Sequence, residues 1–368
     1  MKIGIDIREA GGEKAGKGYY TFNLVQSLLT LDTKNHYILY TKDKIPGFEQ
    51  YKNAEMRQVA AKSFFWHRKV AKDAAKEKVD IFFSPTSYII PAILKKEIKS
   101  IFTVHDLVAF LHAKSHNKKA TIIERFYLKK ALKKAWKVLA VSQNTKRDLL
   151  KKFSFAEDKV EVIYPAASQN FKPLDKTKLY DFIVKTALPK NFFLSVGTLL
   201  PRKNYIRLIE AFKIFFYKNP GWHLIIVGQK TRHYNEILAK IKEQRLDGHV
   251  HILGYLTENS LQNLYNLSQA LIFPSLYEGF GIPLVEAMQC GCPVLASNTS
   301  SIPEVVVDAA LLFDPKDTVE IAHKMQKAAS DQSLCETLHF QGLKQSQKFS
   351  WQAAAKSFYN LLAYGRQL

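Results

Sequence analysis

The sequence is poor in cysteine, in acidic residues and in long apolar stretches. Its three cysteines are an odd number in 368 residues, and no second cysteine pair or histidine cluster completes a metal site. We therefore expect Cys290, Cys292 and Cys335 to be reduced thiols in the core. Nowhere do about eighteen apolar residues run together, and we expect no secretory signal before the strand-like segment Lys2 to Asp6. These absences argue against a disulfide scaffold and a spanning helix, and they predict a cytoplasmic protein.

The shortage of acids leaves the chain strongly basic. There are 33 Asp and Glu against 54 Lys and Arg, a formal net charge of +21. Residues 1–165 hold 32 basic against 17 acidic residues, so the first half carries +15 of the excess. Such a field attracts nucleic acid, phosphorylated substrates or an acidic membrane leaflet. The pattern does not decide among these three partners.

Two segments of the first half combine basic residues with aromatic residues at helical spacing. Lys118 to Lys152 holds twelve Lys and Arg against two acids, and Phe64 to Lys78 is a second candidate. A basic amphipathic helix suits an anionic membrane surface. The same pattern also fits a helix whose aromatic residues pack in the core while its lysines are solvated, so both interpretations stay open.

Apolar strand-like runs alternate with amphipathic helical stretches through both halves, which indicates an α/β protein with parallel sheets. The length fits two domains, and two lobes imply a cleft between them. The segment from Tyr164 to Lys178, with two prolines and no sustained period, is the best linker. The clearest predicted strands are Lys2 to Asp6, Ile101 to Val104, Val138 to Val141, Val160 to Tyr164, Phe192 to Val196, His223 to Val227, His249 to Leu253, Ala270 to Phe273, Pro293 to Ala296 and Leu311 to Phe313.

The most informative segment is SLYEGFGIPLVEAMQCGCPVLAS, from Ser275 to Ser297. Proline favours the first helical turn, so a helix is expected from about Pro283, and Gly291 supplies the left-handed residue that ends it. Glu278 then lies in the loop before the helix, and Glu286 lies in or near the first turn. The segment thus places two carboxylates on either side of a helix start.

Free N–H groups at that helix start form a seat for an anion such as a diphosphate, and Gly279 and Gly281 let it approach without side-chain obstruction. Glu286 is flanked by apolar residues, where a carboxylate needs hydrogen-bond donors that ligand hydroxyls would supply. The pattern predicts a site for a sugar attached to a phosphate. The alternative is that both glutamates merely favour the positive end of a helix dipole.

Other candidates follow predicted strands, whose carboxyl ends collect ligands in doubly wound sheets. Arg202 and Lys203 precede a helix and would hold a leaving diphosphate, or else are solvated cations. His105 would orient a substrate hydroxyl or support developing positive charge in its neutral form, or else is a satisfied buried histidine.

Two further patterns concern turns and caps. Gly16 and Gly18 stand in a glycine-rich loop expected to precede a helix, where they let a phosphate approach or form a surface turn. The dinucleotide fingerprint G-x-G-x-x-G does not fit this loop, so NAD is not inferred. Ser301 and Glu304 fit a capping box, which we interpret as structural.

Taken together, these segments resemble the retaining glycosyltransferases of family 4, the glycosyl transferases group 1 type, with the two-Rossmann-domain GT-B architecture. The resemblance covers nearly the whole chain, and the two glutamates with seven residues between them are its most specific mark. It is carried by GIDIR at Gly4 to Arg8, TVHDL at Thr103 to Leu107, VSQNTKRDL at Val141 to Leu149, SVGTLLPRKN at Ser195 to Asn204, the SLYEGFGIPLVEAM stretch, SSIPEVVVDAALLFDP at Ser300 to Pro315 and FSWQAAAKSFYNLLAY at Phe349 to Tyr364.

The resemblance implies two Rossmann-like domains with parallel sheets facing across a cleft. An acceptor-side domain is expected over residues 1–168 and a domain that binds the nucleotide sugar over residues 169–345. A last helix within residues 346–368 is expected to cross back to the first domain.

The resemblance also assigns roles to the candidate residues. Glu286 is expected to bind the ribose of the sugar nucleotide. Glu278 and the backbone of Gly279, Phe280 and Gly281 are expected to hold the transferred sugar and its phosphate. Lys203 with Arg202 is expected to neutralise the diphosphate, and His105 to lie beside the donor sugar, so that the catalytic residues are His105, Lys203 and Glu278.

The reaction implied is metal-independent transfer of mannose or glucose from a nucleotide diphosphate sugar, with retention, to a glycan or polyprenyl-linked acceptor in cell-envelope synthesis. No cofactor is expected, and the Asp-x-Asp triplet typical of metal-diphosphate binding in the other major glycosyltransferase fold is absent. Mannosyl-transferring relatives favour GDP-mannose over UDP-glucose. A cytoplasmic enzyme held peripherally at the inner face of the membrane is the expected setting.

The chain departs from the family at three positions, and rival functions remain. The glycine loop lacks its usual arginine, Phe83 replaces a histidine often seen before Ser-Pro, and Thr198 stands where many relatives carry an arginine for the diphosphate, for which Arg202 is a candidate substitute. The first two lie in the acceptor half and leave the acceptor undefined. A nucleotide-sugar epimerase or a sugar phosphorylase of the same architecture is the enzyme alternative. A basic nucleic-acid-binding protein is the alternative from another class, although no base-reading module is present.

Overall fold

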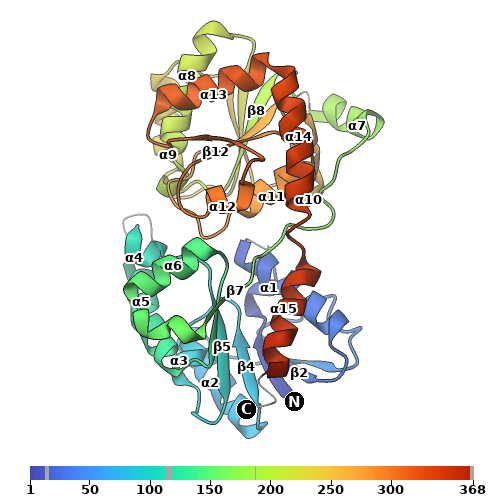
Figure 1. Ribbon diagram of the computed structural model, residues 1–368, viewed down its shortest axis with the longest axis vertical. Helices are drawn as coiled ribbons and strands as arrows, with labels where there is room; N and C mark the ends of the chain where they lie inside the picture. The colour runs from blue at the N-terminus through green and yellow to red at the C-terminus, as the bar shows by residue number, and fades with distance from the viewer. Residues whose placement is uncertain (13–15, 113–117, 187, 365–368) are drawn as a thin grey trace. The chain divides into compact units, whose positions relative to one another are not determined.

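A computed structural model describes residues 1–12, 16–112, 118–186 and 188–364 (Figure 1). The chain forms two compact units. The first comprises residues 1–166 together with the chain from Ser350 onward, and the second comprises Ala167–Phe349. Each unit is built on one parallel sheet with crossover helices, so the predicted α/β class with two parallel-sheet domains is confirmed.

The sheet of the first unit has seven strands in the described part of the chain, in the order β3-β2-β1-β4-β5-β6-β7. The strands are β1 (Lys2–Asp6), β2 (His36–Thr41), β3 (Ala54–Gln58), β4 (Ile81–Ser84), β5 (Lys99–Val104), β6 (Lys137–Ala140) and β7 (Val160–Val162). The helices are η1 (Arg8–Ala10), α1 (Gly16–Leu31), α2 (Ser63–Lys76), α3 (Ile89–Ile93), α4 (Val108–Leu111), α5 (Lys118–Lys134), α6 (Gln143–Lys152), η3 (Ser154–Lys159) and α15 (Trp351–Tyr364).

The sheet of the second unit has six strands in the order β10-β9-β8-β11-β12-β13, counted over its described residues. The strands are β8 (Phe192–Val196), β9 (His223–Val227), β10 (Val250–Gly254), β11 (Ala270–Phe273), β12 (Val294–Ser297) and β13 (Leu311–Phe313). The helices are α7 (Lys176–Thr186), η4 (Pro201–Lys203), α8 (Tyr205–Lys218), α9 (Tyr234–Glu243), α10 (Glu258–Leu267), α11 (Ile282–Gln289), α12 (Ile302–Val306), α13 (Thr318–Ser330) and α14 (Gln332–Ser346).

The predicted strands all form, because short apolar runs buried on both faces are typical of parallel sheets. β1, β8, β9, β11 and β13 have the predicted bounds, and the other five differ from the predicted bounds by one or two residues at one or both ends. Three strands, β2, β3 and β4, were not among the predictions. β3 is the least apolar of these, with the sequence AEMRQ, and it lies at the edge of the sheet, where burial is weakest.

The final helix α15 packs within the first unit, beside α1 (Figure 1). Trp351 lies edge-on to Tyr20 of α1, with ring centroids 5.7 Å apart. Phe358 packs on the fully buried Phe83, with centroids 4.5 Å apart. Phe83, which stands where family members often carry a histidine, therefore fills the core beneath the last helix.

The glycine loop does not have the predicted structure. Helix α1 already begins at Gly16, so Gly16 and Gly18 lie in its first turn rather than in a loop before it. Neither is among the glycines with positive φ in the described residues. Three residues of the predicted loop, 13–15, lie outside the described residues. Gly16 is exposed and Gly18 is buried, and neither supplies a left-handed turn.

The three cysteines are free and buried, which confirms the prediction of core thiols. Burial, with a smaller contribution from Cys335, raises the pKa of the Cys292 thiol to about 12. Such thiols stay protonated near neutral pH and are poor nucleophiles.

Two glycines at the carboxyl ends of neighbouring strands in the second unit lie so close together that a side chain does not fit between their backbones. A Cβ placed on Gly228, after β9, would lie 2.0 Å from the carbonyl oxygen of Gly197, after β8. We expect Gly228→Ala to lower the free energy of unfolding by about 3 kcal/mol, because backbone must move to relieve the overlap. Urea unfolding measures the loss. Gly221→Ala is the control, since no heavy atom lies within 4 Å of its added Cβ, and an equal effect of the two changes would contradict the prediction.

Candidate functional site

Three loops of the second unit meet because their strands are neighbours in the sheet. β8, β11 and β12 lie side by side and parallel, so the loops at their carboxyl ends emerge at one edge. The amide of Leu276 donates to the carbonyl of Arg202 at 2.7 Å. The buried side chain of Asn204 donates to the carbonyl of Pro274 at 3.1 Å. The loop after β8 therefore fixes the loop after β11.

The loop after β12 holds the same segment from its other side. The amide of Glu278 donates to the hydroxyl of Ser300 at 3.0 Å. The buried hydroxyl of Ser301 lies 3.0 Å from the carbonyl oxygen of Glu278 and 3.1 Å from that of Phe280. The capping-box interpretation was therefore wrong for Ser301. It precedes α12 but makes no side-chain cap there, because its hydroxyl donates to the neighbouring loop instead.

The helix start behaves as predicted, with one refinement. α11 begins at Ile282, Pro283 occupies its first turn, and Gly291 follows its end with a left-handed φ of 69°. Gly281 precedes the helix with φ 105°, and a Cβ there would lie 2.9 Å from the Leu284 side chain. Glu286 is the fifth helical residue and so lies in the second turn. Only glycine fits position 281 without strain.

Glu278 is a buried carboxylate held between the two predicted cations. Its Oε2 lies 2.8 Å from Nη1 of Arg202, and its Oε1 lies 2.6 Å from Nζ of Lys203. Burial acts to raise the pKa of Glu278, but Arg202 and then Lys203 outweigh it and lower the pKa to about 2. The glutamate is therefore ionised at any physiological pH, and the three side chains together carry a net charge of one cation.

Lys203 is buried and closely surrounded. Its ammonium lies 4.9 Å from the centre of the Phe273 ring. A Cβ on Gly197 would lie 3.0 Å from its Cε, so glycine there makes room for the lysine stem. The Tyr205 hydroxyl donates to the carbonyl of Gly197 at 2.7 Å and fixes that backbone. The side chain of Lys203 is thus held in one place before any ligand binds.

Glu286 has the opposite electrostatic setting. Its Oε2 accepts a hydrogen bond from the hydroxyl of Tyr265 at 2.9 Å. Burial raises the pKa of Glu286 to about 7, a shift that the Tyr265 hydrogen bond opposes and the charge of Glu258 adds to. The protein thus supplies one hydroxyl donor to this half-buried carboxylate. That ligand hydroxyls complete its hydrogen bonding stays a prediction from the sequence.

His105 lies in the first unit, directly after β5. Its Nε2 lies 2.8 Å from the carbonyl oxygen of Pro85, so Nε2 carries the proton and Nδ1 is an acceptor. The ring lies edge-on to Tyr20, with centroids 4.7 Å apart. Burial and then the charge of Lys17 lower the pKa of His105 to about 4. The imidazole is therefore neutral at physiological pH.

The structure brings several of the predicted site residues together within the second unit, and the others belong to the first unit. Arg202, Lys203 and Glu278 form one cluster, and the backbone of residues 279–281 leads from it to α11, which carries Glu286. The Phe280 ring packs on Phe349, with centroids 5.3 Å apart, and thus belongs to the core. His105, Gly16 and Gly18 belong to the first unit.

Sequence reasoning missed the residues that orient the site, namely Gly197, Asn204, Tyr265, Ser300 and Ser301 in its structural role. Tyr265 lies in α10, twenty-one residues before Glu286, and no local pattern marks it as a partner of that glutamate. Among the described residues, no group of three His, Cys, Asp or Glu side chains is placed to hold a metal ion.

Both halves of the chain match known families. Residues 177–345 match the family of glycosyl transferases group 1. Residues 16–168 match glycosyltransferase family 4. Together the two matches span most of the chain.

Individual relatives carry mannosyltransferase names. O-antigen chain mannosyltransferase B of Escherichia coli is 28% identical over 281 residues, which are 76% of this chain and 73% of that protein. Serotype-specific mannosyltransferase WbdA of Escherichia coli is 32% identical over 260 residues, 69% of this chain but only 32% of that protein. Among solved structures, Anabaena HepE in complex with UDP-glucose matches with a TM-score of 0.80 at 20% identity, over 99% of this chain and 100% of that one. The structural likeness shows the fold.

We expect Glu286→Gln to stabilise the protein in mildly alkaline solution. The folded-state pKa of about 7 exceeds the ordinary 4.5, so the stability that protonation of Glu286 contributes is full below pH 4.5 and is lost as the pH rises through 7. Glutamine imitates the protonated acid at every pH and keeps an acceptor for Tyr265. The expected gain is about 2 kcal/mol at about pH 8 and near zero at about pH 4 in urea unfolding.

The control is Glu336→Gln, on the exposed side of α14, which accepts a hydrogen bond from Gln332 only one turn away. It should change stability little and equally at both pH values. A Glu286→Gln protein whose stability relative to the parent did not vary with pH would contradict the raised pKa.

Proposed function

Because the chain belongs to glycosyltransferase family 4 and has its GT-B fold, we propose that it is a retaining hexosyltransferase that needs no metal ion. It would transfer a hexose from a nucleotide diphosphate sugar to a glycan or lipid-linked acceptor, in the synthesis of a cell-envelope polysaccharide or glycolipid. The observation that carries the proposal is the buried cluster of Glu278, Arg202 and Lys203 at the carboxyl edge of the second sheet.

The cluster suits a leaving diphosphate for an electrostatic reason. Breaking the bond between the sugar and the diphosphate leaves the electron pair on a phosphate oxygen, and charge develops there. Arg202 and Lys203 are already held in place by Glu278, so little reorganisation is needed when that charge appears. The N–H groups before α11, reached past Gly279 and Gly281, add dipoles of the same sign.

The sugar and the ribose would be bound by carboxylates. Glu278 is ionised and would accept hydrogen bonds from the transferred sugar, while Glu286 would accept them from the ribose. The acceptor hydroxyl attacks the same face of the sugar carbon that the diphosphate leaves. A departing phosphate oxygen takes the acceptor proton, so no protein nucleophile is required.

Mannose is the favoured sugar and GDP-mannose the favoured donor. Support comes from the relatives named above, which are mannosyltransferases by name. The UDP-glucose in Anabaena HepE bears on the fold alone at 20% identity. The acceptor half is strongly basic, which favours a phosphate-bearing, polyprenyl-linked acceptor and a cytoplasmic enzyme held at an anionic membrane surface.

The first test combines donor binding with turnover. A panel of sugar nucleotides should show GDP-mannose raising the melting temperature in proportion to its concentration, and mannosyl transfer to a glycan acceptor should survive a chelator.

Lys203→Gln should lower kcat about a hundredfold, because one donor to the developing charge is removed. Lys218→Gln, at the far end of the helix that follows Lys203, should keep full turnover. Interconversion of the sugar nucleotide without acceptor, or sugar transfer to inorganic phosphate, would overturn the proposal.

The second test concerns the protonation state of His105. With a pKa of about 4, its imidazole stays neutral between about pH 5 and about pH 8, so kcat at saturating donor should show no ionisation near 6.5 that depends on this residue. His105→Ala should lower kcat about a hundredfold at every pH in that range. If kcat of the parent changed with pH around 6.5 and this change were lost in His105→Ala, the charged imidazole would take part in the reaction.

A further inference from the structure

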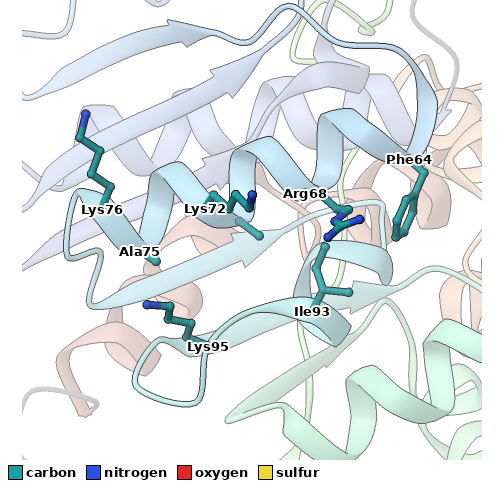
Figure 2. A pocket seen from close by; sticks show the side chains of 8 residues that line it. Phe64, Arg68, Lys72, Ala75, Lys76, Ile93 and Lys95 are labelled. Carbon is teal, nitrogen blue, oxygen red and sulfur yellow. The ribbon is translucent and has the colours of Figure 1, made fainter.

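The first unit contains a pocket that the donor chemistry does not use. It lies between α2 and the segment formed by α3 and the residues after it, and it has a volume of about 660 Å³. We call it the basic pocket; its lining residues are Phe64, Arg68, Ala71, Lys72, Ala75, Lys76, Ile93 and Lys95. Figure 2 shows Phe64, Arg68, Lys72 and Ala75 following one another along α2, with Ile93 and Lys95 on the opposite wall.

Half of the lining side chains are cations. Arg68, Lys72 and Lys76 recur every four residues and so share one face of α2, and Lys95 faces them across the pocket. All four are exposed, and nothing in the described part of the chain forms an ion pair with them. Four like charges around one cavity repel one another, so an anion that enters it relieves that repulsion.

Asp73 of α2 and Glu77, the residue that caps its carboxyl end, do not neutralise these cations, because both are engaged elsewhere. Arg57 of β3 lies 2.9 Å from Oδ2 of Asp73 and 2.7 Å from Oε1 of Glu77. Glu77 also lies 3.3 Å from the ammonium of Lys2. The acids just named therefore stabilise the side of α2 that packs on the sheet, and the basic pocket keeps its positive potential.

The surroundings of the pocket are apolar and exposed. Phe64 at its end lies 6.2 Å, between ring centroids, from Tyr127 of α5. Next to these residues Phe65 is 68% exposed and Phe126 is 63% exposed. On α5, Ile122 is 69% exposed and lies one turn before Phe126. A small anion dissolved in water would not contact the exposed aromatic side chains. The interface of a bilayer binds both aromatic side chains and lysines.

Basic character continues beyond the pocket. Lys95 also lines a neighbouring cavity of about 240 Å³, together with Lys96, Lys133 and Lys134. Lys133 and Lys134 close the carboxyl end of α5, the helix that carries the exposed apolar residues. The two segments that sequence analysis singled out as basic and aromatic therefore share one surface. In the described chain, no helix has the length and hydrophobicity to cross a bilayer.

We infer that the basic pocket binds the phosphate headgroup of an anionic lipid. Arg68, Lys72 and Lys95 neutralise the phosphate, and the guanidinium of Arg68 is able to contact two of its oxygens at once. Phe65 and Phe126 enter the lipid interface beside it. This inference rests on the membrane association proposed above and gives it a specific site, which is separate from the donor-binding residues of the second unit.

The experiment compares two triple variants of the whole chain in vesicle co-sedimentation. Arg68→Ala/Lys72→Ala/Lys95→Ala removes three pocket cations. Lys34→Ala/Lys42→Ala/Lys52→Ala removes three exposed cations of the same unit that do not line the pocket, so the net charge of the two proteins is equal. The vesicles are phosphatidylcholine with and without phosphatidylglycerol. Thermal unfolding confirms that both variants fold.

The parent should bind only the vesicles that contain phosphatidylglycerol. The pocket variant should lose roughly a hundredfold in partitioning, and the control variant less than about tenfold. Phe65→Ser should also weaken binding without changing charge. Turnover on a glycan acceptor free of lipid should be unchanged in the pocket variant, which separates this inference from the proposed transferase activity.

Three results would overturn the inference. Equal losses in the two triple variants would mean that net charge alone drives binding. Absence of any binding by the parent would remove both the site and the proposed membrane association, but would leave the donor chemistry intact. Stabilisation of the parent and not of the pocket variant by inorganic pyrophosphate, without vesicle binding, would identify a site for a free anion instead of a lipid.

Discussion

The second unit is organised around a buried carboxylate, that of Glu278. A buried ionised group must be paired, and Glu278 is paired with both Arg202 and Lys203. These partners come from the loop after β8, while serines after β12 hold the Glu278 backbone. The loops after β8, β11 and β12 thus meet around Glu278, because its buried charge needs partners from the neighbouring loops. The same requirement fixes the two cations that we propose to hold the diphosphate.

The two glutamates of the site illustrate how environment decides the chemistry of one residue type. Glu278 touches two cations and its pKa falls to about 2, whereas Glu286 meets a tyrosine hydroxyl in apolar surroundings and its pKa rises to about 7. In the first unit, burial lowers the pKa of His105 to about 4, so this imidazole is a third group with a shifted pKa. Perturbed groups of this kind concentrate at functional sites because binding and catalysis need them, although folding alone is better served by ordinary values.

Charge is distributed differently in the first unit. There Asp73 of α2 and the C-cap residue Glu77 form ion pairs with Arg57, and cations of α2 line a cavity. Unpaired cations beside exposed aromatic residues add nothing to folding stability, and exposed apolar side chains are a cost in water. Their presence along α2 and α5 is explained if the surface has an anionic, partly apolar partner, as we propose.

Local pattern in the sequence determined the α/β class, every strand of the second sheet, four strands of the first, and a helix that starts near Pro283 and ends before Gly291. Burial on both faces and backbone preference act over a few residues, so local sequence carries this information. Tertiary structure decided the partners. Ser301 caps nothing and bonds to another loop, Glu286 meets Tyr265 from α10, and Lys95 joins Arg68 across a pocket, since strand order sets which distant segments meet. Hydrogen bonds and ion pairs depend on distances of a few ångströms, and sequence separation carries no information about these.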